Sequence, residues 1–283
     1  MSTLAEQLGY SSGDRLLIIN CDGLGLCHSS NEGVFQSLRA GIATSASLMV
    51  PCPWARGAAA RYQPGDDIGV HLTLTSEFEH YRWGPITHAP SLLGGAGGFP
   101  RTVADVWDHA DVGEVHRELR AQVERAIQWG IDVTHLDSHM QTLPLRPEFF
   151  DVFLDLAVEF DLPIRLPAAQ FQEDAGFPFR ERAAEEGIVS PDQIMSHSGI
   201  GGAQALMSIL SELPAGVTEI YLNPAVDSPE SRALTPNALG LAEDLALLTD
   251  SEMVRSSLER LGIKLIGWDA LRQAQRSVAI DRL

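Results

Sequence analysis

Positive charge is scarce in this chain of 283 residues. Lys264 is the only lysine, and the 20 lysine and arginine residues are outnumbered by 38 aspartate and glutamate residues, which leaves a formal net charge of -18. The pI is about 4.8. Nucleic acids and anionic membranes bind proteins mainly through basic patches. We therefore expect neither a nucleic acid nor a membrane surface as a partner, and favour a small-molecule ligand.

Cysteine is also rare, and long apolar runs are missing from the sequence. Cys21, Cys27 and Cys52 are too few for a disulfide framework and are typical of proteins from a reducing compartment. No run approaches the roughly 18 to 20 apolar residues of a membrane-spanning helix. The first ten residues, MSTLAEQLGY, have neither the basic start nor the apolar stretch of a signal peptide. We expect a cytoplasmic protein.

The stretch LLIINCDGLGL at residues 16–26 shows the pattern that recurs along the chain. Leu16–Ile19 is a short apolar run, as in a parallel strand buried on both faces. It leads to Asp22, which is followed by Gly23 and Gly25, residues that allow backbone angles other residues resist. The pattern predicts a strand that places a carboxylate at its carboxyl end, the edge where parallel α/β folds build their sites.

Strand-like and helix-like segments alternate over the whole sequence, which predicts a parallel sheet or barrel. A chain of this length could form two domains, but α/β barrels often run this long as one, and we expect a single domain over residues 1–283. The strand-like segments are residues 16–19, 43–50, 68–74, 132–136, 162–166, 217–222 and 263–266. Helical spacing is clearest at residues 112–129, 148–159, 203–213 and 251–261.

Residues 76–101 interrupt this alternation with aromatic, glycine and proline residues. An insertion of this length inside a compact domain is usually a lid or a binding loop, and a loop without a role is the alternative. Trp83, with Phe78 and Tyr81 nearby, favours a substrate wall, since aromatic faces stack on sugars and other flat apolar faces. We predict a lid-like insertion here, with Trp83 in contact with the substrate.

Residues of catalytic type recur at or near the ends of the predicted strands. A single polar strand end is usually a helix cap or a hydrogen-bonded core group, but several at one barrel mouth are harder to explain in that way. Two histidines with a carboxylate also form a common catalytic metal set that leaves one position for water. The residues are Asp22, His71, Asp137, His139, Arg165, Asn223 and Asp269.

Several sequence blocks resemble the YdjC-like carbohydrate deacetylases, the family that includes chitooligosaccharide deacetylase. They include LLIINCDGLGL, IGVHLTLTSE, VTHLDSHMQTL and TEIYLNPAVDSPE, and the resemblance runs from about residue 16 to residue 269. It implies a distorted (β/α) barrel of about seven parallel strands, similar to that of polysaccharide deacetylases. It also implies a homodimer and a hydrolase that uses one divalent metal, zinc or magnesium, to remove the acetyl group from an N-acetylated amino sugar or oligosaccharide.

The resemblance assigns roles to several residues of the predicted site. His71 and His139 correspond to the family's two histidine metal ligands, and Asp22 corresponds to the aspartate thought to act as general base. Asp137 is expected to bind substrate and to orient the ligand imidazoles, as carboxylates near metal sites commonly do. We expect Arg165 to be a catalytic residue together with Asp22 and Asn223.

Two positions depart from the family's pattern. Gly23 stands where the ADDFG motif has its second aspartate, a metal ligand, and Asn223 stands where an HP motif has the histidine thought to be the general acid. With one carboxylate fewer, zinc is favoured over magnesium, since zinc suits imidazole ligands. Asparagine cannot supply a proton, an effect typically worth about 10² to 10⁴-fold. The alternative function is therefore a protein of altered or absent catalysis that binds a carbohydrate-like ligand or performs another reaction in the same pocket.

Overall fold

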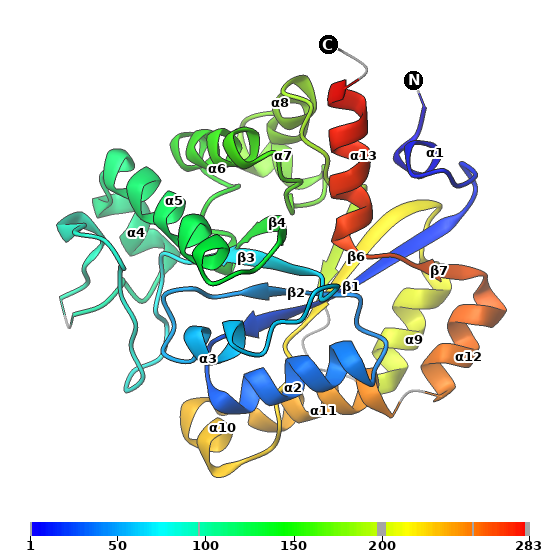
Figure 1. Ribbon diagram of the computed structural model, residues 1–283, viewed down its shortest axis with the longest axis horizontal. Coiled ribbons are helices and arrows are strands. Elements are labelled where there is room, and N and C mark those ends of the chain that lie inside the picture. The colour runs from blue at the N-terminus through cyan, green and yellow to red at the C-terminus, as the bar shows by residue number, and fades with distance from the viewer. Residues whose placement is uncertain (1, 96, 197–201, 251, 281–283) are drawn as a thin grey trace.

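The computed structural model describes residues 2–95, 97–196, 202–250 and 252–280. Its centre is a curved sheet of parallel strands with helices packed around the outside (Figure 1). The strands within the described residues are β1 (Arg15–Leu24), β2 (Ser45–Leu48), β3 (Ile68–Leu72), β4 (Val133–Ser138), β5 (Gln193–Ser196), β6 (Gly216–Leu222) and β7 (Ile263–Leu265).

The helices form two groups on opposite flanks of the sheet. In Figure 1, α2 and α11 lie side by side along one flank, and α5 and α6 lie along the other. Within the described part of the chain, none of the helices combines the length and the apolar character that a bilayer crossing requires. The helices are α1 (Leu4–Gln7), α2 (His28–Arg39), α3 (Ala55–Ala59), α4 (Val103–His109), α5 (Val112–Gln128), α6 (Pro147–Phe160), α7 (Phe171–Ala175), α8 (Phe179–Glu185), α9 (Gly202–Glu212), α10 (Pro229–Leu234), α11 (Ala238–Thr249), α12 (Glu252–Leu261) and α13 (Trp268–Ile280), with 3-10 turns η1 (Pro90–Leu92) and η2 (His139–Gln141).

The strand order is β4-β3-β2-β1-β6-β5, and every pairing is parallel. The short strand β7 pairs with Arg15–Leu17 at the start of β1, whereas β2 pairs with Asn20–Leu24 further along. Among the described residues no ladder joins β4 to β5, so the sheet is an open barrel. This confirms the predicted α/β class and the distorted (β/α) barrel.

One of the seven predicted strands is wrong. Residues 162–166 form no strand, and only a single bridge joins Ile164 to Leu136 of β4. The segment contains Pro163 and is followed by Pro167, and prolines lack the backbone N–H that a ladder requires. The fifth strand along the chain is β5 instead, a partly exposed segment that pairs with β6 at the opposite end of the strand order.

The two faces of β1 explain how the barrel interior becomes polar. Leu16 and Ile18 point to the interior and pack in one apolar cluster, and the next two residues on this face are Asn20 and Asp22. The interior is therefore apolar near the amino edge of the sheet and polar at the carboxyl edge. Cys21 lies on the opposite face and is buried, as are the other two cysteines, and all three are free thiols.

The insertion at residues 76–101 is docked against the body of the protein. The indole nitrogen of Trp83 donates to the carbonyl of Thr75 at 2.8 Å. The buried carboxylate of Glu118 on α5 accepts from the backbone N–H groups of Ile86 at 3.1 Å and Thr87 at 2.9 Å. These contacts tie both the aromatic part and the middle of the insertion to the strand end and to α5.

Candidate active site

A cavity of about 480 Å³ opens at the carboxyl edge of the sheet. Five of the predicted site residues line it, which brings together side chains from five separate parts of the chain. The lining residues are Asp22, His71, Ser138, His139, Met140, Gln141, Leu145, Arg165, Ile194, Tyr221 and Asn223.

Two imidazoles face one another at this cavity. Nε2 of His71 lies 3.2 Å from Nδ1 of His139. The other nitrogen of each ring faces a carboxylate: Nδ1 of His71 lies 2.8 Å from Oδ1 of Asp137, and Nε2 of His139 lies 3.0 Å from Oε2 of Glu77. When each outer nitrogen donates its proton to its carboxylate, both inner nitrogens present lone pairs to the same point. Two lone pairs that face one another repel, so this arrangement is favoured by a metal ion or a shared proton between the two nitrogens.

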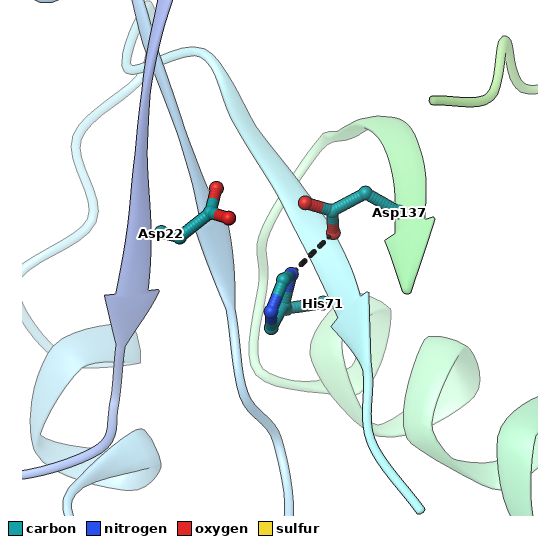
Figure 2. A group of neighbouring side chains, drawn as sticks. All are labelled: Asp22, His71 and Asp137. Atoms are coloured by element: carbon teal, nitrogen blue, oxygen red, sulfur yellow. Dashed lines mark ion pairs between the residues drawn. The ribbon is translucent and has the colours of Figure 1, made fainter. Parts of the chain in front are cut away.

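This donor set fits a divalent metal. Two nitrogens 3.2 Å apart can both bind one ion, since zinc to nitrogen bonds measure about 2.0 to 2.1 Å. Figure 2 shows Asp22, His71 and Asp137 pointing toward one another, and their donor atoms lie within 4.8 Å of one another. Of the two carboxylates in this group, Asp22 is the one that also lines the cavity.

Arg165 forms the centre of a buried ionic cluster below the imidazoles. Its guanidinium holds both oxygens of Asp22 at 2.8 Å, and it contacts Asp137 at 2.7 Å and Glu219 at 2.7 Å. Three carboxylates around one guanidinium leave an excess of negative charge in a buried place, which favours a further cation nearby.

The pKa shifts follow from this charge arrangement. Burial acts against protonation of His71, but the neighbouring carboxylates of Asp137 and Asp22 outweigh it and raise the His71 pKa. Burial raises the pKa of Glu219, and Arg165 only partly offsets this effect. For Glu77 the order reverses, since His139 overcomes the effect of burial and lowers the pKa. The site therefore attracts positive charge at its cavity-facing surface.

Small polar side chains complete the floor of the site. Asn20 donates from Nδ2 to Asp22 at 2.8 Å, and Ser47 donates to Asp137 at 2.9 Å. Sequence reasoning missed both residues, and also Glu77 and Glu219. Glu219 had a usable signal, since it is the one charged residue in a strand that is otherwise uncharged and largely buried.

Gly23 and Asn223, the two departures from the family's pattern, lie next to each other. Gly23 has a φ of +82°, and a Cβ built on it would lie 3.9 Å from Oδ1 of Asn223. Asn223 follows β6 and lines the cavity, and its backbone N–H donates to Asp244 at 3.1 Å. The missing carboxylate and the missing imidazole thus affect the same corner of the site.

Three predicted residues lie away from the cavity lining. Asp137 is fully buried, with its oxygens against protein groups, so it is positioned to orient His71 rather than to contact substrate. Trp83 is only 4% exposed and packs behind His139, with ring centroids 6.5 Å apart; its stacking on a sugar stays a prediction. The expectation for Asp269 is wrong: its backbone N–H binds Asp67, just before β3, because β7 is short and ends beside the first half of β1.

The comparisons with known proteins identify the family and the fold of this chain. The family model described as YdjC-like protein matches residues 16–259. The chain therefore belongs to the YdjC-like family, and the predicted resemblance is confirmed. It is 35% identical over 276 residues to a protein of Thermus thermophilus named carbohydrate deacetylase, covering 96% of this chain and 98% of that relative. It is 27% identical over 275 residues to one of Yersinia enterocolitica named chitooligosaccharide deacetylase, covering 89% and 97%.

A solved structure shows the same fold. The crystal structure of a protein of Enterococcus faecalis V583, named for cellobiose-phosphate cleavage, matches with a TM-score of 0.81 and covers 91% of this chain and 99% of its own. The two sequences are 24% identical, so this likeness concerns the fold alone.

Proposed function

We propose that this protein is a metal-dependent hydrolase that removes the acetyl group from an amino sugar or oligosaccharide. The observation that carries the proposal is the pair of imidazoles whose outer nitrogens face carboxylates and whose inner nitrogens lie 3.2 Å apart at a cavity. The names of the relatives from Thermus and Yersinia support the acetylated carbohydrate as substrate.

His71 and His139 hold the metal in this proposal, and Asp22 takes the proton of the attacking water. A divalent ion bound there supplies Lewis-acid activation of the acetyl carbonyl and of water. Arg165 binds both oxygens of Asp22 and so fixes the direction in which this carboxylate accepts a proton. Asp137 and Glu77 fix the ring orientation and the tautomer of the two histidines, the usual role of a carboxylate next to a ligand imidazole.

The sugar binds against the apolar part of the cavity lining in this proposal. Met140 is 45% exposed, and Tyr221 lies with its ring over the guanidinium of Arg165 at 4.8 Å. Together with Leu145 and Ile194 they offer an apolar surface beside the polar floor. Such a surface suits the C–H face of a sugar ring, while the floor binds the acetyl group.

Metal content and acetate release test the proposal together. Purified protein is dialysed, analysed for bound metal, reloaded with zinc or magnesium and incubated with di- and tri-N-acetylchitooligosaccharides. We expect one metal ion per chain and acetate release that disappears with a chelator. The matched control is His139→Gln, which keeps a polar side chain of similar size but loses the inner nitrogen.

The same experiment separates the second candidate function, a sugar-binding protein without hydrolysis. Gly23 and Asn223 are the observation in its favour, because they remove a carboxylate and a proton donor from one corner of the site. Saturable binding of the oligosaccharides with no acetate release, at any metal loading, contradicts the hydrolase and supports this alternative.

A further inference from the structure

The chemistry of the leaving group separates two kinds of acetylated sugar. Hydrolysis of an N-acetyl amide expels an amine nitrogen, which has to receive a proton as its bond to the acetyl carbon breaks. Hydrolysis of an O-acetyl ester expels an alkoxide oxygen, a far more stable anion that can leave with hydrogen bonding alone. A site without a proton donor for the leaving atom therefore favours esters.

Asn223 is the residue that faces the cavity where such a donor is needed. Its side-chain amide can donate a hydrogen bond but cannot transfer a proton. Position 23, directly beside it, offers no donor either, since Gly23 has no side chain and a Cβ there would lie 3.9 Å from Oδ1 of Asn223.

Besides Asp22, the side chains of the described cavity lining that could transfer a proton are His71, His139 and Tyr221, and the two histidines are already engaged. Both nitrogens of His71 and both nitrogens of His139 have partners, one another and the two carboxylates. His28, close to Asp22 in sequence, has a side chain that is 54% exposed and faces Glu32. It does not line the cavity.

Asp22 is held too firmly to serve both the water and the leaving atom. Arg165 binds both of its oxygens at 2.8 Å, and Asn20 donates to one of them at 2.8 Å. Three hydrogen bonds from buried donors prevent the carboxylate from turning. It can accept the proton of the attacking water, but it cannot follow the departing group.

We propose that this site hydrolyses O-acetyl esters of sugars, and does so in preference to N-acetyl amides. The proposal rests on the proposed deacetylase function and narrows its substrate class. The oxygen of water bonds to the acetyl carbon, and the bond from that carbon to the sugar oxygen breaks. Asp22 takes one proton from the water and releases it to solvent, and the sugar alkoxide takes the proton of the acetic acid formed. The balance is one ester and one water consumed, and one sugar hydroxyl, one acetate and one proton produced.

A matched pair of substrates tests this preference. Methyl 2-O-acetyl-β-glucoside and methyl 2-acetamido-2-deoxy-β-glucoside differ in the atom that carries the acetyl group. Acetate release from each is measured for the metal-loaded wild type, Asn223→His and Asn223→Gln, with the enzyme-free rate subtracted. Only histidine can transfer a proton, while glutamine controls for a longer side chain at the same position.

We expect the wild type to have the larger kcat/KM on the ester. Asn223→His should raise kcat/KM on the amide by about 10²-fold, the lower end of the effect of a general acid, and raise the ester value by less than about tenfold. Asn223→Gln should raise neither. Each variant is compared with the wild type on the same substrate. The intrinsic difference in reactivity between esters and amides therefore cancels when the two variant-to-wild-type ratios are compared.

Four results overturn the proposal. The first is a wild type with the larger kcat/KM on the amide. The second is an Asn223→His variant in which kcat/KM rises by the same factor on both substrates, or which binds a second metal ion per chain. The third is loss of amide hydrolysis in His197→Gln or in Tyr221→Phe. His197 follows β5 in the sequence and lies outside the described residues, whereas Tyr221 lines the cavity, and the residue whose change abolished amide hydrolysis would be the proton donor. The fourth, no acetate from either glucoside or from N-acetylated chitooligosaccharides, overturns the proposed function as well, whereas the first three leave it standing.

Discussion

Two histidines at strand β4 have opposite surroundings although four positions separate them. His135 is fully buried near the amino edge of the sheet, where its ring stacks on Trp268 with centroids 4.5 Å apart and an angle of 11° between the rings. His139 follows the carboxyl end of the strand and lines the cavity. The difference teaches that burial of a histidine does not by itself indicate a ligand. What matters is a nitrogen left open toward a cavity while the other faces a carboxylate.

The carboxyl and amino edges of the sheet also differ in the charges that surround their histidines. At the carboxyl edge, Asp137 and Asp22 outweigh burial and raise the pKa of His71. At the amino edge, burial dominates and lowers the pKa of His135 to about 3. His135 even occupies the space of a side chain at Gly69, where a Cβ would come within 2.5 Å of the ring. It is a neutral core group, and His71 is suited to hold positive charge beside it.

The largest expected effect comes from removing the cavity-facing nitrogens. His71→Gln and His139→Gln should each lower kcat/KM for acetate release by about 10³-fold or more, since a catalytic metal contributes several kcal/mol. Each should also lower the bound metal per chain. His135→Gln is the matched control at the other edge, and its folded fraction should keep its metal. Loss of metal in His135→Gln with an unchanged fold contradicts the distinction between the two edges.

Much of this distinction could be predicted from the sequence, because apolar runs that end in a polar residue predict parallel strands with a common edge. This logic located Asp22, His71, His139 and Asn223, which all line the cavity. Arg165 lines it too, although the strand that was predicted to carry it does not form. It failed for Asp269, because strand length and register, which the sequence pattern does not contain, put the end of β7 at the other edge.

The remaining errors have the same origin in long-range contacts. The motif THLDSH contains two histidines, and the spacing alone does not indicate that His135 packs under Trp268, more than a hundred residues away. The carboxylate Glu77 reaches His139 across 62 positions, and Arg165 reaches Glu219 across 54. Such partners are set by the tertiary fold, so local periodicity cannot reveal them.

The second effect is on stability and is specific to the amino edge. His135 has a pKa of about 3 in the folded protein and 6.5 as a model value, so below pH 6.5 the unfolded chain binds a proton that the folded protein does not. Its contribution is complete above pH 6.5 and is lost as the pH falls toward 3. The free energy of unfolding should therefore fall by about 3 kcal/mol between pH 7 and pH 4 through this residue.

Urea unfolding of wild type and His135→Gln at both pH values measures this effect, since other titrations cancel in the difference. The stability advantage of the wild type should shrink by about 3 kcal/mol at pH 4. Asp67 should show the opposite pH dependence. Burial raises its pKa to about 6, so its protonation favours the folded state at low pH. An advantage of wild type over His135→Gln that is equal at pH 7 and pH 4 contradicts a neutral buried His135.

The third effect tests the carboxylates that orient the ligand imidazoles at the carboxyl edge. Asp137→Asn and Glu77→Gln should each weaken metal binding by about 10 to 100-fold, the usual result of changing a partner of a ligand histidine. Asp137→Asn should have the larger effect, since Asp137 is fully buried and also contacts Arg165 at 2.7 Å. Competition with a chelator of known affinity gives both values. Glu114→Gln, a carboxylate on α5 that binds Ser91, should leave metal affinity unchanged.

The smallest effect concerns Gly23 and decides whether the carboxyl edge lacks a ligand. Gly23→Asp offers a third carboxylate, but φ of +82° strains any side chain by about 1 kcal/mol or more. Gly23→Ala carries the same strain without the carboxylate, so the difference in metal affinity between the two variants isolates the ligand. We expect Gly23→Asp to bind metal more tightly than Gly23→Ala. The double variant Gly23→Asp with Asn223→His should gain more amide hydrolysis than the sum of the gains in free energy of the two single variants, because both changes act on one transition state. Equal metal affinity in the aspartate and alanine variants would mean that a carboxylate at this corner does not reach the metal.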